Sequence, residues 1–151
     1  MRALIQRVTY ARVLIDGKVV GEIGSGILVF LGIGKKDNQA DIEFMVRKIP
    51  QLRIFDDSQG KMNRSLKEVH GEILLVSQFT LYGNCRKGLR PSYDEAAVPD
   101  EAQRIYREVN QGLRNQNLPV AEGVFGAMMQ VELCNDGPVT ILLDSKERGN
   151  Q

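Results

Sequence analysis

The sequence has few of the residues that build metal sites and disulfides. Among 151 residues there is no tryptophan, a single histidine (His70) and only two cysteines, Cys85 and Cys134, which lie far apart without C-x-x-C spacing. So few soft ligands argue against a zinc site, and two free thiols are typical of a reducing cytosol. We therefore expect no metal, no cofactor and no disulfide.

Long apolar runs and a strong charge imbalance are missing as well. The longest apolar run, residues 26–33, is much shorter than the roughly 20 residues of a membrane span, and Arg2 and Arg7 interrupt the N-terminal pattern. We expect no export signal, no membrane segment and a cytoplasmic location. Twenty Lys plus Arg against nineteen Asp plus Glu argue against bulk coating of nucleic acid, and we expect no DNA partner.

The N-terminal segment has the pattern of several β-strands. ALIQRVTYARVLI and KVVGEI flank Asp16-Gly17, a strong hairpin signal, and ILVFLGI follows Gly24-Ser25-Gly26. We predict three or four antiparallel strands over residues 1–34. The last of them lacks polar alternation, so it should be central and covered on both faces.

Two segments have helical spacing. Apolar residues at positions 42, 45, 46 and 49 follow Asp37, the expected N-cap, and Pro50 ends the pattern. The second helix begins near Pro99, with Asp100 and Gln103 spaced as in a capping box, and its apolar stripe continues to Leu113.

Further strands are predicted over residues 51–55, 72–76, 128–134 and 139–144, with a polar loop over 56–63. The motif Asn135-Asp136-Gly137-Pro138 separates the last two strands and is expected to form a turn. No repeat or linker divides the chain. We predict one α+β domain over residues 1–151, with a mostly antiparallel, barrel-like sheet and two main helices.

Templates for nucleophilic catalysis fit poorly. A Ser-His-Asp or Cys-His arrangement must use His70, which an exposed loop explains more simply, and Cys85 is best explained as a chance cysteine in a basic loop. That loop holds Arg86, Lys87 and Arg90, which suit phosphate contacts, although a solvated surface explains the loop on its own more simply.

The segment SQFTLYG has the composition of a small pocket. Ser77, Gln78 and Thr80 supply hydrogen-bonding groups and Phe79 a flat apolar face, which suits a nucleoside or an aminoacyl ester. The alternative is an edge strand whose polar residues face water.

Four segments together resemble one known family. MRALIQRV, SQFTLYG, GVFGAMMQVEL and NDGPVT, in this order across nearly the whole chain, are similar to the D-aminoacyl-tRNA deacylase (D-tyrosyl-tRNA(Tyr) deacylase) family. The resemblance implies a cytosolic homodimer that cleaves the ester between a D-amino acid, or glycine mischarged on tRNA(Ala), and the terminal adenosine of tRNA.

The resemblance also assigns residues by position. It implies that Ser77, Gln78, Phe79 and Thr80 line the pocket, with Phe79 and Thr80 at the reacting centre and Phe125 and Met129 holding the adenosine. It implies that Gly137 and Pro138 form a cis peptide that enters the partner subunit's pocket as a chirality filter, framed by Asn135 and Thr140.

Because an aminoacyl ester is already activated, the mechanism we expect is assisted by the substrate's own ribose 2′-hydroxyl, with backbone N–H groups around Phe79 and Thr80 holding the oxyanion. A covalent Thr80 nucleophile is the alternative, although no base is apparent beside it. A non-catalytic RNA-binding module and an editing module within a synthetase complex remain open as other functions.

Overall fold

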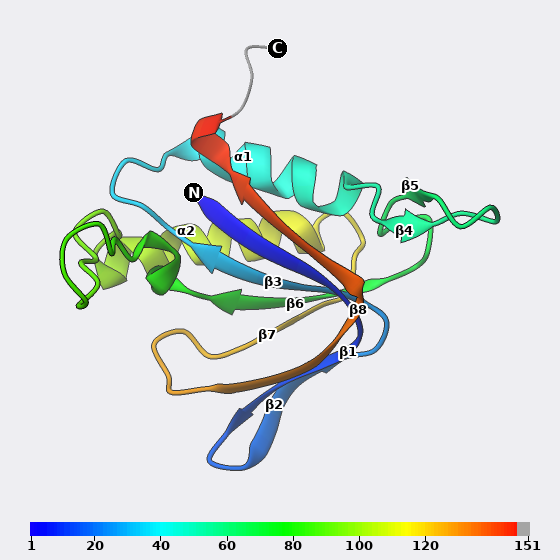
Figure 1. Ribbon diagram of the computed structural model, residues 1–151, viewed down its shortest axis with the longest axis horizontal. Coiled ribbons are helices and arrows are strands. Elements are labelled where there is room, and N and C mark those ends of the chain that lie inside the picture. Colours follow the sequence, from blue (N-terminus) through cyan, green and yellow to red (C-terminus); the bar gives the residue numbers. More distant parts are fainter. Residues whose placement is uncertain (148–151) are drawn as a thin grey trace.

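The computed structural model describes residues 1–147 and contains one large sheet, one small sheet and two helices (Figure 1). The strands are β1 (Arg2–Ile15), β2 (Lys18–Ile23), β3 (Gly26–Gly32), β4 (Phe55–Asp56), β5 (Met62–Arg64), β6 (Glu72–Ser77), β7 (Val120–Glu122) and β8 (Gln130–Asp144). The helices are α1 (Gln39–Lys48) and α2 (Pro99–Arg114), with 3-10 turns η1 (Ile49–Gln51), η2 (Phe79–Tyr82) and η3 (Ser145–Glu147). Neither helix is long and apolar enough to cross a membrane.

Strand β1 organises the large sheet. One of its edges pairs antiparallel with β8 along nearly its whole length, and its other edge pairs antiparallel with β3 in its first half and with β2 in its second. The sheet continues from β3 through β6 to β7 by parallel pairing. At Gly21 the β2 backbone lies against the carbonyl of Glu122 in β7, which nearly closes the sheet. The predicted α+β, barrel-like, mostly antiparallel fold is confirmed.

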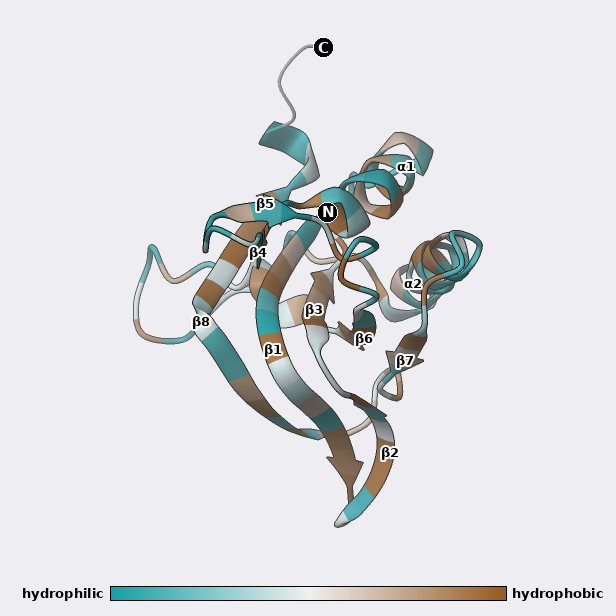
Figure 2. Ribbon diagram, turned by 90° about the vertical axis from the view of Figure 1, so that its right-hand side faces the viewer, coloured by the Kyte–Doolittle hydropathy of each residue, from teal (hydrophilic) through white to brown (hydrophobic). Residues whose placement is uncertain are grey.

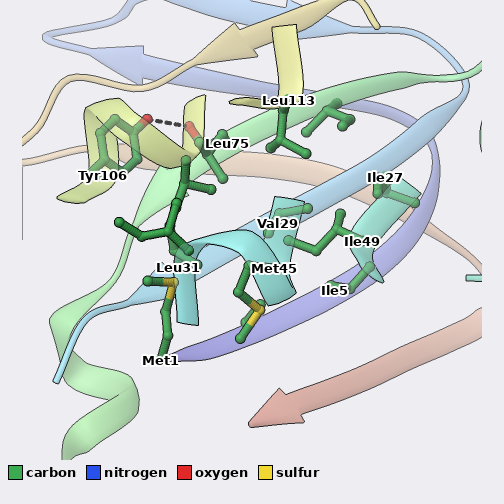
Figure 3. Packing of buried hydrophobic residues seen from close by; sticks show 14 of the residues in the cluster. Met1, Ile5, Ile27, Val29, Leu31, Met45, Ile49, Leu75, Tyr106 and Leu113 are labelled. Atoms are coloured by element: carbon green, nitrogen blue, oxygen red, sulfur yellow. Dashed lines mark hydrogen bonds between the residues drawn. The ribbon is translucent and has the colours of Figure 1, made fainter. Parts of the chain in front are cut away.

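The core lies on both faces of the central strand β3, as its unbroken apolar sequence predicts. Ile27, Val29 and Leu31 belong to the cluster that packs against α1 and α2, whereas Leu28 belongs to a second cluster on the opposite face. Figures 1 and 2 show both helices on one side of the sheet, and Figure 3 shows the side chains of this larger cluster. Burying such side chains contributes roughly 1.5–3 kcal/mol each.

Both helices form where predicted, but their N-caps differ from the prediction. The N-cap of α1 is Asn38, whose side chain accepts from the backbone N–H of Ala40 (3.0 Å), while Asp37 accepts from Gly34 N–H (2.7 Å). Helix α2 starts with Pro99 and has Val98 as its N-cap, without a side-chain hydrogen bond, so the Asp100–Gln103 capping box is wrong. Proline at the first position fixes the start because its backbone φ already suits a helix.

A buried polar cluster joins both ends of the described chain to α1. The amino group of Met1 contacts Asp37 Oδ1 (2.6 Å) and Ser145 Oγ (2.7 Å), and Ser145 donates to Asp41 Oδ1 (2.6 Å). Burial alone would raise the pKa of Asp41, but hydrogen bonds from Lys146, Ser145 and the Asn38 backbone lower it to about 2. The charged form of this carboxylate is therefore the native one at neutral pH.

Two strand predictions are wrong in detail. Residues 52–54 are irregular, and the strand predicted over 51–55 is reduced to the short β4. The segments predicted as two strands around a turn form the single strand β8, because β1 pairs with both halves of it. The pairing partner, β1, lies more than 110 residues away in sequence.

Candidate active site

The segment that ends β6 turns away from the sheet and becomes exposed. Ser77 is the last residue of β6, Gln78 donates its backbone N–H to Leu31 O (2.8 Å), and the next four residues form η2. Phe79 is 55 % exposed, and Thr80 is exposed as well. The alternative prediction, an edge strand whose polar residues face water, is wrong for residues 79–82, because these residues form η2 and not a strand.

Contacts within this turn hold its side chains in place. The Gln78 side-chain amide donates to Thr80 Oγ1, and Gly83 N–H donates to Thr80 O (2.9 Å). The Phe79 ring meets Tyr93 edge to face, with centroids 5.0 Å apart. Phe79 and Thr80 open a helical turn, where the first backbone N–H groups have no partner inside the helix. These N–H groups can therefore donate hydrogen bonds to an anionic ligand atom.

The loop between β7 and β8 carries the two predicted adenosine contacts. Phe125 is half-buried and packs on the larger cluster, 6.0 Å from the Tyr106 ring centroid, and Met129 packs on the second cluster. The loop is tied to β6 because Gly123 N–H donates to Leu75 O (3.1 Å), and the Tyr106 hydroxyl donates to the same carbonyl (3.0 Å; Figure 3). Phe125 therefore lies near the strand that ends in Ser77.

The motif predicted as a turn is a bulge in the middle of β8. In the β1–β8 ladder, Thr140 pairs with Gln6 and Asn135 pairs with Val8. Only position 7 of β1 lies between these two pairs, opposite the four residues 136–139 of β8. Such a bulge interrupts the ladder and lets the extra residues protrude. A proline is tolerated here because its backbone nitrogen is not needed for pairing.

Asn135 and Thr140, the residues on either side of the bulge, stabilise its shape by hydrogen bonds. The Asn135 amide donates to Arg7 O and to Val139 O, both at 3.0 Å, and the Thr140 hydroxyl contacts Asn135 Oδ1 at 3.3 Å. The Gly137–Pro138 peptide bond is cis, and both residues are exposed. Gly137 has φ +121°, a conformation that side-chain-bearing residues rarely adopt.

Arg7 anchors the bulge from its buried side, a role that no motif in the sequence indicates. Its side chain is only 9 % exposed, and its Nε contacts both the backbone O and the carboxylate of Asp136 at 3.2 Å. Its Nη1 donates to Ile54 O (2.8 Å) and lies 3.4 Å from Asp56. The signal was the alternation at the start of the sequence, where the apolar residues 1, 3 and 5 are buried and place residue 7 on the same face.

Comparison with known proteins identifies the family. Residues 4–144 match the family described as D-Tyr-tRNA(Tyr) deacylase. The chain belongs to this family. A Thermosipho africanus protein named D-aminoacyl-tRNA deacylase is 60 % identical over 147 residues, which cover 97 % of this chain and 99 % of that protein. A Desulfitobacterium hafniense protein of the same name is 54 % identical with the same coverage.

Solved structures of similar proteins agree on the fold. One titled "c-Myc DNA Unwinding Element Binding Protein" is 44 % identical, has a TM-score of 0.90 and covers 95 % of this chain and 98 % of its own. Another, described as a probable eukaryotic D-amino acid tRNA deacylase, is 20 % identical with a TM-score of 0.77, over 94 % of this chain and 97 % of its own. The second likeness concerns the fold alone.

Within this family member, the predicted site residues fall into three groups, and one chain does not bring the first two together. Residues 77–80 follow β6, whereas the bulge lies in the middle of β8, at the opposite side of the view in Figure 1. A third group, Arg86, Lys87 and Arg90, lies on an exposed loop after η2. His70 lies in a turn and both cysteines are exposed, and residues 1–147 contain no group of side chains suited to a metal ion.

Proposed function

We propose that this protein hydrolyses the ester bond of D-aminoacyl-tRNA and releases free D-amino acid and tRNA. The observation that carries the proposal is the exposed turn 77–80, with its polar groups and the Phe79 ring, in a chain whose relatives over 97 % of its length are named D-aminoacyl-tRNA deacylase. In this proposal Ser77 and Gln78 bind the aminoacyl group, and Phe125 and Met129 hold the terminal adenosine.

The reaction is assisted by the substrate. The neighbouring ribose 2′-hydroxyl orients the attacking water, and the backbone N–H groups at Phe79 and Thr80 stabilise the oxyanion. The Thr80 hydroxyl already contacts the Gln78 amide, and no carboxylate or imidazole contacts it within residues 1–147. This arrangement supports substrate assistance over the covalent Thr80 nucleophile, because a nucleophilic hydroxyl needs a base.

Selectivity for the D configuration comes from steric exclusion. In the proposed complex the Gly137 and Pro138 carbonyls lie against the α-carbon of the substrate, so that an L side chain collides while a D side chain points to solvent. Glycine has no side chain to exclude, so glycyl-tRNA, including glycine mischarged on tRNA(Ala), is also a substrate.

The filter acts across a homodimer. Within residues 1–147 the outer edge of β8 pairs with no strand, although this strand is 15 residues long. A long free edge normally has to be covered, and the exposed Leu142 (59 %) and Tyr10 (47 %) beside it supply apolar surface for a second copy. Such a pairing lets the bulge of one chain enter the pocket of the other, in a dimer that works in the cytoplasm.

A nucleic-acid-binding function without catalysis is the second candidate. It is favoured by the name of the 44 % identical protein, which describes binding to a DNA element, and by the exposed basic loop with Arg86, Lys87 and Arg90. In the deacylase proposal the same loop contacts tRNA phosphates.

The deciding experiment measures release of free amino acid from D-Tyr-tRNA and L-Tyr-tRNA, in buffer without added metal. The proposal predicts rapid release of D-tyrosine and L-tyrosine release near the uncatalysed rate. A protein that binds tRNA but releases neither amino acid would instead be the binding module.

A further inference from the structure

A cavity lies at the end of the η2 turn. Its volume is about 620 Å³, and its walls come from the start of β1, the loop between β3 and α1, the end of η2 and the end of β8. None of the residues assigned above to the aminoacyl group or the adenosine lines it. Tyr82 and Gly83 do, which places the cavity directly after Thr80 in the chain.

The charge of this cavity is positive. Five cationic side chains and three carboxylates line it. Two of the carboxylates are neutralised, because Asp37 lies 2.6 Å from the Met1 amino group and Asp144 lies 3.1 Å from Arg2. Lys35 and Lys36 are exposed and make no ion pair in the described part of the chain.

Both lysines are held on a rigid turn. Gly34 N–H donates to the Asp37 carboxylate (2.7 Å) and Asp37 N–H donates to Gly34 O (3.1 Å), which closes a four-residue turn with the lysines at its two central positions. Lys35 N–H donates to Glu95 O (3.0 Å), and Lys36 O accepts from Lys146 Nζ (3.0 Å). Binding a ligand here would therefore cost little backbone entropy.

The aromatic ring in the cavity is already occupied. The Arg2 guanidinium lies 4.7 Å above the Tyr82 ring and donates to Leu81 O (2.9 Å). The Tyr82 hydroxyl end packs against Gly34, where even a methyl group would collide with it. A nucleobase finds little room to stack on this ring, so the cavity is suited to a charged group.

From these contacts we infer that Lys35 and Lys36 bind two phosphodiester groups of the single-stranded tRNA segment just before the terminal adenosine. This inference rests on the proposed function. Arg86 lines the same cavity, and its loop is closed at the neck by two hydrogen bonds between the Asn84 and Ser92 backbones (2.8 and 3.0 Å). Lys35, Lys36 and Arg86 thus form one basic strip along the cavity beside the end of η2. This strip contacts the sugar-phosphate backbone of the tRNA and does not read its sequence.

The test compares a full substrate with a minimal one. D-Tyr-tRNA reaches the strip, whereas D-tyrosyl-adenosine has no phosphate to place there. For Lys35→Gln/Lys36→Gln we expect the ratio of kcat/KM for D-Tyr-tRNA to kcat/KM for D-tyrosyl-adenosine to fall at least tenfold. The log–log salt dependence for D-Tyr-tRNA should become shallower by about 1.4, the value for two phosphate contacts to a single strand.

The matched control is Lys18→Gln/Lys67→Gln, which removes two exposed charges from β2 and from the loop before β6, neither of which lines the cavity. It should leave both the ratio and the salt dependence as in the wild type. An unchanged ratio for Lys35→Gln/Lys36→Gln would overturn the inference while D-tyrosine release by the wild type still supports the deacylase. A fall in the ratio with an unchanged salt dependence would also overturn it, since the contact would then not be to phosphate. Wild-type protein that cleaves neither substrate would overturn the proposed function itself.

Discussion

The bulge 136–139 and the turn 77–80 are both exposed, yet they are built in opposite ways. The bulge is held from behind by a buried arginine and by the amide of Asn135, with backbone and side-chain contacts on both sides. The turn has backbone hydrogen bonds at Gln78 and Thr80, but its side chains are held by one hydrogen bond between Gln78 and Thr80 and by the edge-to-face contact of Phe79 with Tyr93.

This difference fits two different tasks. A steric filter excludes a ligand only if it cannot move aside, so its backbone needs many fixed contacts. A pocket wall must instead leave its N–H groups and aromatic face free for the substrate. Since the two segments lie apart in one chain, we also predict that they meet only between two copies of the chain.

The largest expected effect comes from Pro138→Ala. Removing the ring takes away the rigid part of the proposed filter, so L-Tyr-tRNA cleavage should rise about 100-fold, which corresponds to about 2.7 kcal/mol and to the relief of a steric clash. Turnover of D-Tyr-tRNA should change far less. Parallel rate measurements on both substrates check this, and continued exclusion of L-Tyr-tRNA would remove Pro138 from the filter.

Next in size is the loss of the anchor, Arg7→Met. It removes hydrogen bonds from a buried guanidinium to the bulge and to the 54–56 segment, so the free energy of unfolding should fall by about 2 kcal/mol, measured in urea. The control is Arg12→Met, also in β1, which breaks an exposed ion pair with Glu132 of β8. It should lower the free energy of unfolding by less than about 1 kcal/mol. Equal losses for both variants would contradict the anchoring role.

Phe79→Ala should lower the activity while changing the stability of the protein little. The ring is 55 % exposed, so unfolding should become easier by less than about 1 kcal/mol. The loss of an apolar face against the substrate should lower kcat/KM for D-Tyr-tRNA about tenfold. A large loss of stability with unchanged kcat/KM would make Phe79 a structural residue.

The smallest effect is expected for Thr80→Ala. If the substrate's 2′-hydroxyl assists hydrolysis and backbone N–H groups hold the oxyanion, kcat should change by less than about tenfold, since only the contact with Gln78 is lost. Single-turnover kinetics measure this directly. A drop of several thousand-fold would support the covalent nucleophile, and full activity on a 2′-deoxy terminal adenosine would contradict substrate assistance.

Sequence patterns predicted those parts of the fold that depend on local spacing. The helices α1 and α2 follow from apolar periodicity, and the buried strand β3 follows from an unbroken apolar run; neighbouring residues alone decide both. The continuous β8 did not, because it depends on pairing with β1 at the other end of the chain. Local turn residues therefore led to a hairpin where the structure has a bulge.

The site shows the same division. The residues of the 77–80 segment and the bulge were found through motifs, but their supports were not, because Arg7 and the 54–56 segment meet only in the folded chain. The strip with Lys35 and Lys36 has no motif at all. It becomes visible only when the β3–α1 loop and the end of η2 lie on one cavity.

The most direct test of the central claim, that one chain filters for the pocket of the other, uses mixed dimers. One chain carries Ser77→Trp, which fills its own pocket but keeps Pro138, and the other carries Pro138→Ala with an open pocket. In the mixed dimer the open pocket faces the intact Pro138, so L-Tyr-tRNA should be rejected while D-Tyr-tRNA is cleaved. Cleavage of L-Tyr-tRNA by the mixed dimer, at the rate per open pocket of the Pro138→Ala homodimer, would contradict the account.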